Sequence, residues 1–239
     1  MYNLEHFKRQ LLQWNIELSK IQEQQLLTYY EMLVEWNSFM NLTAITEFED
    51  VFEKHFLDSI SLVTVYDISE KHSVIDIGTG AGFPGLVLKI IFPNIEITLM
   101  DSLNKRIKFL DAVIENLGLQ HVNTIHGRCE DLARKEEFRE KFDVCVSRAV
   151  ANLSTLSEYA LPFVKVGGQF ISYKSEKLAE ELASAENAIA LLGGKVKTQK
   201  SFYLPETDIF RNLLVIDKMS KTDKRFPRKA GVPAKEPLR

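Results

Sequence analysis

A glycine-rich segment from Asp76 to Gly85, with the sequence DIGTGAGFPG, is the part of the chain best suited to chemistry. It follows a short apolar run at 74–75 and leads into an apolar helix start at 86–88. Glycine is needed where a chain turns sharply out of a strand with positive φ, and where a ligand approaches the backbone closely. The segment therefore predicts a nucleotide cofactor bound against the main chain.

Two cofactors fit this loop. Gly80, Gly82 and Gly85, followed by Asp101, satisfy the dinucleotide fingerprint in which an acid bonds the ribose hydroxyls. That fingerprint would predict an NAD-linked oxidoreductase. Its strand should run directly into the first glycine of the motif, whereas Gly78 and Thr79 intervene here.

The other pattern places Asp76, Gly78, Gly80 and Gly82 at alternate positions, with Asp101 closing the next strand. This spacing is typical of S-adenosylmethionine sites. A dehydrogenase would also need a separate substrate-binding half, and too little chain remains for one. We therefore expect S-adenosylmethionine and keep the oxidoreductase as the alternative.

Alternating apolar and helical patterns predict the elements that position this loop. Strands are expected at 73–78, 95–101, 122–127, 142–147, 168–174, 195–204 and 211–217, and helices at 84–92, 104–117, 153–164 and 176–192. Regular alternation implies a parallel sheet covered on both faces. The last two strands lack an intervening helix, so they should form an antiparallel hairpin. The seven-stranded α/β arrangement resembles the class I, Rossmann-like methyltransferase fold.

Extensions flank this domain. We expect helices at 4–15, 19–36 and 46–63 as an N-terminal helical cap, with capping boxes at Ser19–Gln22 and Thr46–Glu49. The expected organisation is a helical extension at 1–70, the cofactor-binding domain at 71–218 and a basic tail at 219–239. From Lys218 onward the chain has eight Lys or Arg residues against two acids, although its net charge is −3. The tail is either a solvated extension or an arm that binds nucleic acid phosphates.

Polar residues follow each of the first four strands, and ligands bind at that edge of such sheets. Asp76 and the backbone of 78–83 can hold the amino-acid part of the donor, while Asp101 suits the two ribose hydroxyls. Glu130, beside Cys129, can read the adenine edge. Arg148 follows the fourth strand, at the mouth of the pocket.

Each of these residues also has a structural interpretation. Asp101 could cap the helix that begins near Asn104. Glu130 could be a surface charge, and Arg148 could pair with a nearby carboxylate without touching a ligand. His55 and Asp58 are weaker site candidates, since the five histidines show no metal-ligand spacing.

Composition excludes several classes. No stretch approaches the roughly 20 apolar residues of a membrane span, and the N-terminus lacks a signal-peptide core. Cys129 and Cys145 have neither metal-ligand nor disulfide spacing, and a neutral thiol is expected for Cys145 within its buried strand. We expect a cytoplasmic protein, a monomer, that binds neither metal nor membrane.

The fourth strand ends in Ser147-Arg148-Ala149-Val150, which lacks the motif that adenine-amine methyltransferases commonly carry there. No cysteine is placed as an attacking thiol. A nucleophile that already has a free lone pair, such as a guanine ring nitrogen, needs no base. Such a site would work by alignment of the reactants and exclusion of water.

Motifs along the whole chain resemble one family. They are the glycine loop, Trp36-Asn37 with 41–43, 55–59, Ser147-Arg148-Ala149, and the tail at 227–235. Together they resemble the glucose-inhibited division protein B family of bacterial 16S ribosomal RNA (guanine-N7)-methyltransferases. The resemblance implies methyl transfer from S-adenosylmethionine to a guanine N7 in 16S ribosomal RNA or the small ribosomal subunit.

The resemblance also implies roles for individual residues. The family's donor-binding positions correspond to Gly78, Phe83, Cys129, Glu130 and Arg148. We assign a catalytic role to Arg148, which should contact the donor, a phosphate or the guanine O6. The RNA contacts expected from the tail are Lys224, Arg225, Arg228, Lys229 and Lys235.

Overall fold

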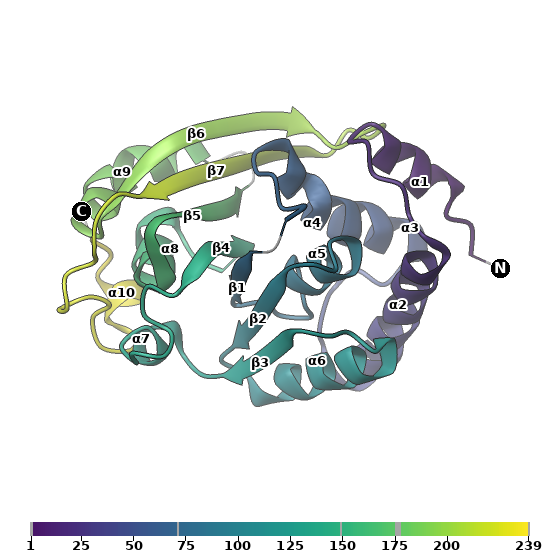
Figure 1. Ribbon diagram of the computed structural model, residues 1–239, viewed down its shortest axis with the longest axis horizontal. Coiled ribbons are helices and arrows are strands. Elements are labelled where there is room, and N and C mark those ends of the chain that lie inside the picture. Colours follow the sequence, from purple (N-terminus) through teal and green to yellow (C-terminus); the bar gives the residue numbers. More distant parts are fainter. Residues whose placement is uncertain (1, 71, 149, 175–177, 239) are drawn as a thin grey trace.

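A seven-stranded sheet forms the centre of the computed structural model, which describes residues 2–70, 72–148, 150–174 and 178–238. Its strand order is β3-β2-β1-β4-β5-β7-β6 (Figure 1). The strands are β1 (Ser73–Ile77), β2 (Glu96–Asp101), β3 (Val122–His126), β4 (Phe142–Arg148), β5 (Val164–Lys174), β6 (Gly194–Tyr203) and β7 (Phe210–Lys218). The first five pair in parallel, and β7 is antiparallel to both β5 and β6. The predicted fold class, including the terminal hairpin, is confirmed.

The central strands are buried on both faces, as expected for a parallel sheet covered by helices. Ile75 of β1 pairs with Thr98 of β2 on one side and with Cys145 of β4 on the other. The covering helices are α5 (Gly85–Ile91), α6 (Asn104–Leu117), α7 (Cys129–Leu132), α8 (Leu153–Ala160) and α9 (Leu178–Leu191). Ala149 and the predicted start of the last of these helices at 176 lie outside the described residues.

The N-terminal helices share a hydrophobic core with the sheet. They are α1 (Glu5–Leu12), α2 (Lys20–Met40), α3 (Phe48–Val51) and α4 (Asp58–Ile60). Tyr29 of α2 is fully buried, stacks on Phe56 and donates a 2.5 Å hydrogen bond to the carbonyl of Ala81 in the glycine-rich loop. The extension therefore supports the loop directly.

One predicted capping box is confirmed and the other is wrong. Ser19 and Gln22 cap α2 reciprocally, with Gln22 Oε1 accepting from Ser19 N at 2.9 Å. The box predicted at Thr46–Glu49 does not form: α3 begins after Glu47, whose side chain makes no capping hydrogen bond. The helix predicted at 46–63 is also not continuous, because a π-helix at Phe52–Leu57 joins α3 to α4 and a 3₁₀ turn at Ser61–Thr64 follows. Irregular turns of this kind often occur at functional sites.

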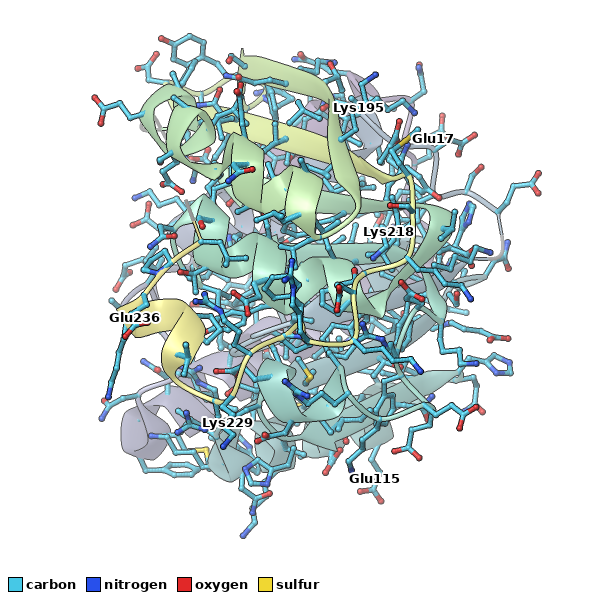
Figure 2. All side chains as sticks on the ribbon, turned by 90° about the vertical axis from the view of Figure 1, so that its left-hand side faces the viewer. Glu17, Glu115, Lys195, Lys218, Lys229 and Glu236 are labelled. Carbon is cyan, nitrogen blue, oxygen red and sulfur yellow. The ribbon has the colours of Figure 1, made fainter. Side chains whose placement is uncertain are left out.

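The basic tail is neither a solvated extension nor a free arm, because its backbone is bonded to the domain. Figure 2 shows the segment after Lys218 lying across the domain surface and leading to Lys229 and the short helix α10 (Val232–Lys235). Arg139 donates to the carbonyls of Thr222 and Phe226, at 2.7 and 2.9 Å, and the Phe226 ring is buried in the core.

Arg228, one of the predicted RNA contacts, also anchors this segment. Its guanidinium makes a two-pronged ion pair with Glu158 of α8, with Nη2 to Oε2 at 2.7 Å and Nε to Oε1 at 3.0 Å. The Glu158 side chain is completely buried. This pair engages Nε and Nη2, while the Arg228 side chain as a whole is 25% exposed.

Removing this anchor should destabilise the whole domain. Arg228→Ala leaves the Glu158 carboxylate buried without its charged partner, a change that typically costs about 3–5 kcal/mol. We expect the urea midpoint of unfolding to fall accordingly, as followed by circular dichroism. Arg9→Ala breaks the exposed pair with Glu206 and serves as the control, with a much smaller change expected. Equal effects of the two substitutions would contradict the anchoring role.

Candidate active site

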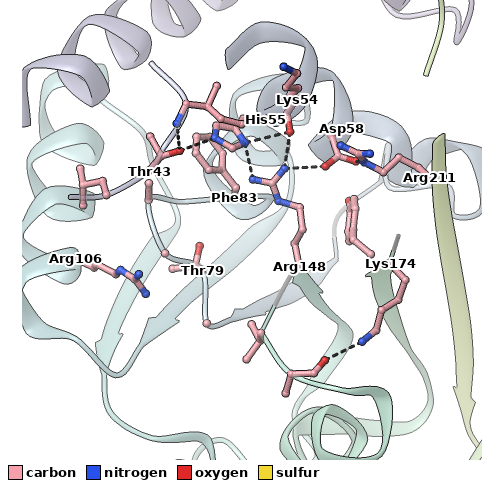
Figure 3. A pocket seen from close by; sticks show the side chains of 18 of the residues that line it. Thr43, Lys54, His55, Asp58, Thr79, Phe83, Arg106, Arg148, Lys174 and Arg211 are labelled. Carbon is pink, nitrogen blue, oxygen red and sulfur yellow. Dashed lines mark hydrogen bonds and ion pairs between the residues drawn. The ribbon is translucent and has the colours of Figure 1, made fainter. Parts of the chain in front are cut away.

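A cleft of about 820 Å³ opens at the carboxyl ends of β1, β4 and β5 (Figure 3). This edge of an open α/β sheet is where ligands bind, near the point where the strand order reverses between β1 and β4. Three parts of the chain form its walls: the glycine-rich loop, the N-terminal helical extension, and the ends of β4, β5 and β7. The lining residues used below are Thr43, Lys54, His55, Asp58, Gly78, Thr79, Gly80, Phe83, Arg106, Arg148, Val150, Ala151, Lys174, Glu181 and Arg211.

The glycine-rich loop needs its glycine at position 78. Gly78 has φ +66°, and a Cβ there would lie 2.6 Å from Cγ2 of Val150. Gly80 has φ +63° and nothing within 4 Å of a Cβ position, so its surface is open. A bare backbone facing an open cleft is the cradle that a nucleotide cofactor requires, and Gly78, Gly80 and Phe83 of the predicted residues line it.

Asp76 shapes this loop from within the domain. The residue is fully buried, and its Oδ2 accepts hydrogen bonds from Thr79 Oγ1 at 2.6 Å and from Gly85 N at 2.8 Å. Burial raises the pKa of this carboxyl to about 7. Asp76 and Gly82 are not among the residues lining the cleft, so the structure gives Asp76 a role in holding the loop.

Asp101 lies at the end of β2, where the sequence predicts the ribose-binding acid. Its Oδ2 accepts from Gly80 N at 3.0 Å and from Arg106 Nη1 at 3.1 Å, while Oδ1 accepts from Leu103 N at 2.9 Å. A carboxylate offers about four acceptor positions, so these bonds leave room for one more donor. The acid therefore sits against the loop, but its side chain is 1% exposed and, like Asp76, it is not among the residues lining the cleft, so its ribose contact stays a prediction.

Cys129 and Glu130 begin α7, beyond β3. Glu130 is almost fully buried, and its Oε1 accepts from the backbone N–H of Gly231 in the tail at 2.9 Å. An adenine contact by Glu130, as predicted, would compete with this hydrogen bond to the tail. Burial raises the pKa of the Cys129 thiol and of Cys145, which lies within β4. The predicted neutral thiol at Cys145 is confirmed.

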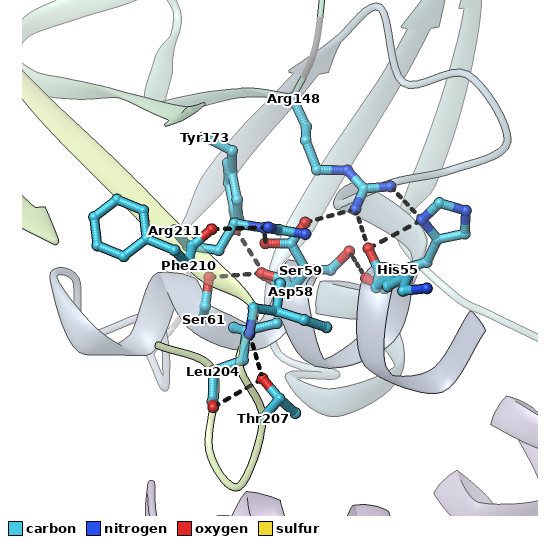
Figure 4. Close-up of polar contacts among 12 residues, drawn as sticks. His55, Asp58, Ser59, Ser61, Arg148, Tyr173, Leu204, Thr207, Phe210 and Arg211 are labelled. Carbon is cyan, nitrogen blue, oxygen red and sulfur yellow. Dashed lines mark hydrogen bonds and ion pairs between the residues drawn. The ribbon is translucent and has the colours of Figure 1, made fainter. Parts of the chain in front are cut away.

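Arg148 ends β4 and points into the cleft, where the N-terminal extension holds its guanidinium (Figure 4). Nη1 donates to the carbonyl of Lys54 at 2.9 Å and to Oδ2 of Asp58 at 2.8 Å. The guanidinium carbon also lies 5.2 Å from the centre of the Phe83 ring. The sequence left open that Arg148 pairs with a nearby carboxylate. The structure contains such a pair, with Asp58, at the wall of the cleft.

His55 is a neutral hydrogen-bonding group in this arrangement. Its Nδ1 lies 3.0 Å from Nη2 of Arg148, and its Nε2 lies 2.9 Å from Oγ1 of Thr43. Burial, and then the nearby Arg148, lower the pKa of His55 to about 4. Nδ1 also lies 3.1 Å from the carbonyl of Lys54, so it accepts from the Arg148 guanidinium in one neutral tautomer and donates to that carbonyl in the other. His55 is therefore uncharged near neutral pH.

Sequence reasoning missed four basic residues of the cleft: Lys54, whose carbonyl bonds Arg148, and Arg211, Lys174 and Arg106. Arg211 of β7 donates through Nε to Oδ1 of Asp58 at 2.9 Å. Lys174 of β5 pairs with Glu181 at 2.7 Å and donates to the carbonyl of Ala151 at 2.8 Å, which fixes the segment after β4. Arg106 bonds Asp101. No local motif identifies these residues, because they lie far apart in the sequence and come together only through the order of the strands in the sheet.

The charge of the cleft favours an anionic ligand. Its lining includes the five cations Lys54, Arg106, Arg148, Lys174 and Arg211 but only the two acids Asp58 and Glu181. The described residues include no cluster of three potential metal ligands. None of the helices in the described ranges is long and apolar enough to cross a membrane. A cationic cleft around a glycine cradle suits a nucleotide cofactor together with a phosphate-bearing substrate.

Solved structures share the fold at low sequence identity. A SAM-dependent methyltransferase from Aquifex aeolicus superposes with a TM-score of 0.52 at 15% identity, covering 70% of this chain and 92% of that one. M. jannaschii TYW2, solved in complex with AdoMet, superposes with a TM-score of 0.51 at 14% identity, covering 72% and 77%. These likenesses confirm the methyltransferase fold.

Sequence relatives are far closer. A protein of Lachnoclostridium phytofermentans named ribosomal RNA small subunit methyltransferase G is 54% identical over 93% of this chain and 92% of its own length. A protein of the same name from Exiguobacterium sibiricum is 48% identical over 99% of both chains. The model of the GidB family, described as rRNA small subunit methyltransferase G, matches residues 22–210. The chain therefore belongs to the GidB family of ribosomal RNA small subunit methyltransferases.

Proposed function

We propose that this enzyme transfers a methyl group from S-adenosylmethionine to N7 of one guanine in 16S ribosomal RNA, within the cytoplasm. The observation that carries the proposal is the convergence of the glycine cradle and Arg148 on one cationic cleft, in a chain of this family. Family membership favours this cofactor over the dinucleotide that the loop alone also fits. The substrate is the RNA or the small ribosomal subunit that contains it.

The glycine-rich loop and Asp101 are the groups that would hold the cofactor. The loop backbone faces the cleft at Gly78 and Gly80, and Asp101 is fixed beside Gly80. When bound, S-adenosylmethionine supplies a methyl group on a positively charged sulfur. Asp76 keeps the loop in shape through Thr79 and Gly85, so its contribution to donor binding is indirect.

The reaction needs no base from the protein. Guanine N7 carries a free lone pair, so it attacks the methyl carbon in line while the carbon–sulfur bond breaks, and no proton leaves the base beforehand. His55 is neutral and committed to Arg148 and Thr43. The protein then contributes alignment and exclusion of water, which can lower a barrier by roughly 7–11 kcal/mol.

Arg148 is the residue suited to hold the target. Within the described part of the chain, Lys54, Asp58 and His55 occupy three of its five N–H groups. The Nε–H and one Nη2–H remain for guanine O6 or a phosphate. Both O6 and N7 cannot be engaged together, since that would block the reacting lone pair.

Replacing Arg148 should impair the transfer of methyl groups to RNA. We expect Arg148→Ala to lower kcat/KM by about 100-fold, the scale of loss that a misplaced substrate produces. Incorporation of labelled methyl into unmodified 16S RNA or small subunits measures this loss, and equilibrium dialysis with S-adenosylmethionine measures donor binding. Unchanged turnover together with unchanged donor affinity would exclude Arg148 from the site.

Exposed cations of the tail remain available for RNA. Lys224, Arg225, Lys229 and Lys235 are exposed, whereas Arg228 is held by Glu158. The tail presents these four charges from a fixed backbone, because Glu130 and Arg139 bond its main chain. We assign to them the binding of RNA phosphates that the sequence predicts for the tail, with Arg228 contributing through the part of its side chain that Glu158 leaves exposed.

Neutralising part of this surface should weaken RNA binding and reduce its salt dependence. For Lys229→Gln with Lys235→Gln, the slope of log affinity against log salt should fall by roughly 0.7 for each phosphate that the protein no longer binds. The control pair is Lys195→Gln with Lys197→Gln, which removes two exposed cations from β6. Filter binding of 16S RNA over a salt series makes the measurement. The assignment fails if both pairs change the slope equally.

A further inference from the structure

Asp58 is buried between two arginines that come from distant parts of the chain. Its side chain is 4% exposed, with Oδ2 2.8 Å from Nη1 of Arg148 and Oδ1 2.9 Å from Nε of Arg211. The partners belong to β4 and β7, while Asp58 begins α4 of the N-terminal extension. Figure 4 shows the carboxylate lying between the two guanidinium groups.

The same short stretch of helix makes all three polar contacts to the Arg148 guanidinium. Lys54 contributes a carbonyl, His55 its Nδ1, and Asp58 a carboxylate. Lys54 and His55 lie within the π-helix, and Asp58 follows it directly. Acceptors at three points fix the plane of a rigid, planar guanidinium.

The contact with Asp58 is the charged one, so it should dominate the orientation. A charge-assisted hydrogen bond is roughly twice as strong as a neutral one, and this pair is largely shielded from water. Arg211 binds the second oxygen of Asp58, which limits rotation of the carboxylate itself. Arg211 therefore fixes the Asp58 carboxylate, and Asp58 in turn fixes the Arg148 guanidinium.

We propose that Asp58 is a positioning residue that orients the Arg148 guanidinium toward the RNA substrate, an inference that rests on the function proposed above. Asp58 has both oxygens committed to arginines and does not need to touch the substrate. Loss of its charge would leave Arg148 in the cleft with a wider range of orientations. The effect should fall on methyl transfer and spare the donor, because the function proposed above assigns Arg148 to the RNA and leaves the donor to the glycine-rich loop, Asp101, Cys129 and Glu130.

A double-mutant cycle tests this role. Asp58→Asn should lower kcat for RNA methylation by about 100-fold, with KM for S-adenosylmethionine unchanged. In an Arg148→Lys background, the same substitution should have less than a tenth of that effect, because the guanidinium it orients is gone. A purely structural role would cost the same in both backgrounds, and that result would overturn the proposal.

The control is Asp143→Asn, at the opposite end of β4. Asp143 also accepts hydrogen bonds, from Ser73 Oγ at 2.7 Å and from the Ser73 backbone N–H at 2.8 Å, and it pairs with Lys165. We expect this variant to keep the wild-type kcat. A loss equal to that of Asp58→Asn would mean that any disturbance of β4 suffices, and would overturn the proposal.

A second measurement does not depend on turnover. The two Nη1–H protons of Arg148, which bond Lys54 and Asp58, should give resolved, slowly exchanging NMR signals in the wild type and in Asp143→Asn, and should broaden or merge in Asp58→Asn as rotation about the Cζ–Nη1 bond becomes faster. An unchanged signal in Asp58→Asn would overturn the proposal. Wild-type protein that methylates no RNA would instead refute the proposed function, so the two failures are distinguishable.

Discussion

The cleft depends on one buried arrangement of charge, in which Asp58 joins Arg148 and Arg211. Removing charges from water is costly, and an ion pair inside a protein is stable only when further hydrogen bonds satisfy its members. Here the Lys54 carbonyl and His55 complete the set around Arg148. The N-terminal extension is thereby joined to the carboxyl edge of the sheet, where the glycine-rich loop also begins. This cluster therefore holds together two of the three parts that form the walls of the cleft, the N-terminal extension and the ends of β4 and β7.

Sequence patterns predicted the framework because local rules determine it. Buried strands such as β1 are mostly apolar, and the glycine-rich loop can be recognised since positive φ at Gly78 admits few other residues. The π-helix at Phe52–Leu57 was not predicted, because nothing in its composition distinguishes it from an ordinary helix. Arg211 was missed for another reason: it reaches the cleft only because β7 inserts beside β5, a pairing between distant segments.

The number of charges in the tail did not predict that the tail is bound to the domain. Its excess of cations predicted an RNA-binding arm, yet Arg228 is bound to Glu158 and the backbone is held by Arg139 and Glu130. Composition cannot reveal this, since the partners are far away in the sequence and Glu158 is buried. The same segment thus stabilises the domain through some residues and presents others to solvent. Glu130, predicted to contact adenine, links the tail to the cofactor side of the sheet.

The central claim is that the cleft directs a methyl group to N7 of a guanine. Its most direct test is mass spectrometry of nucleosides and mapped fragments from 16S RNA incubated with the enzyme and labelled S-adenosylmethionine. We predict labelled 7-methylguanosine at a single position, formed about 100-fold more slowly by enzyme that lacks the Arg148 side chain. Label on an exocyclic amine, on a ribose or on another base would contradict the claim.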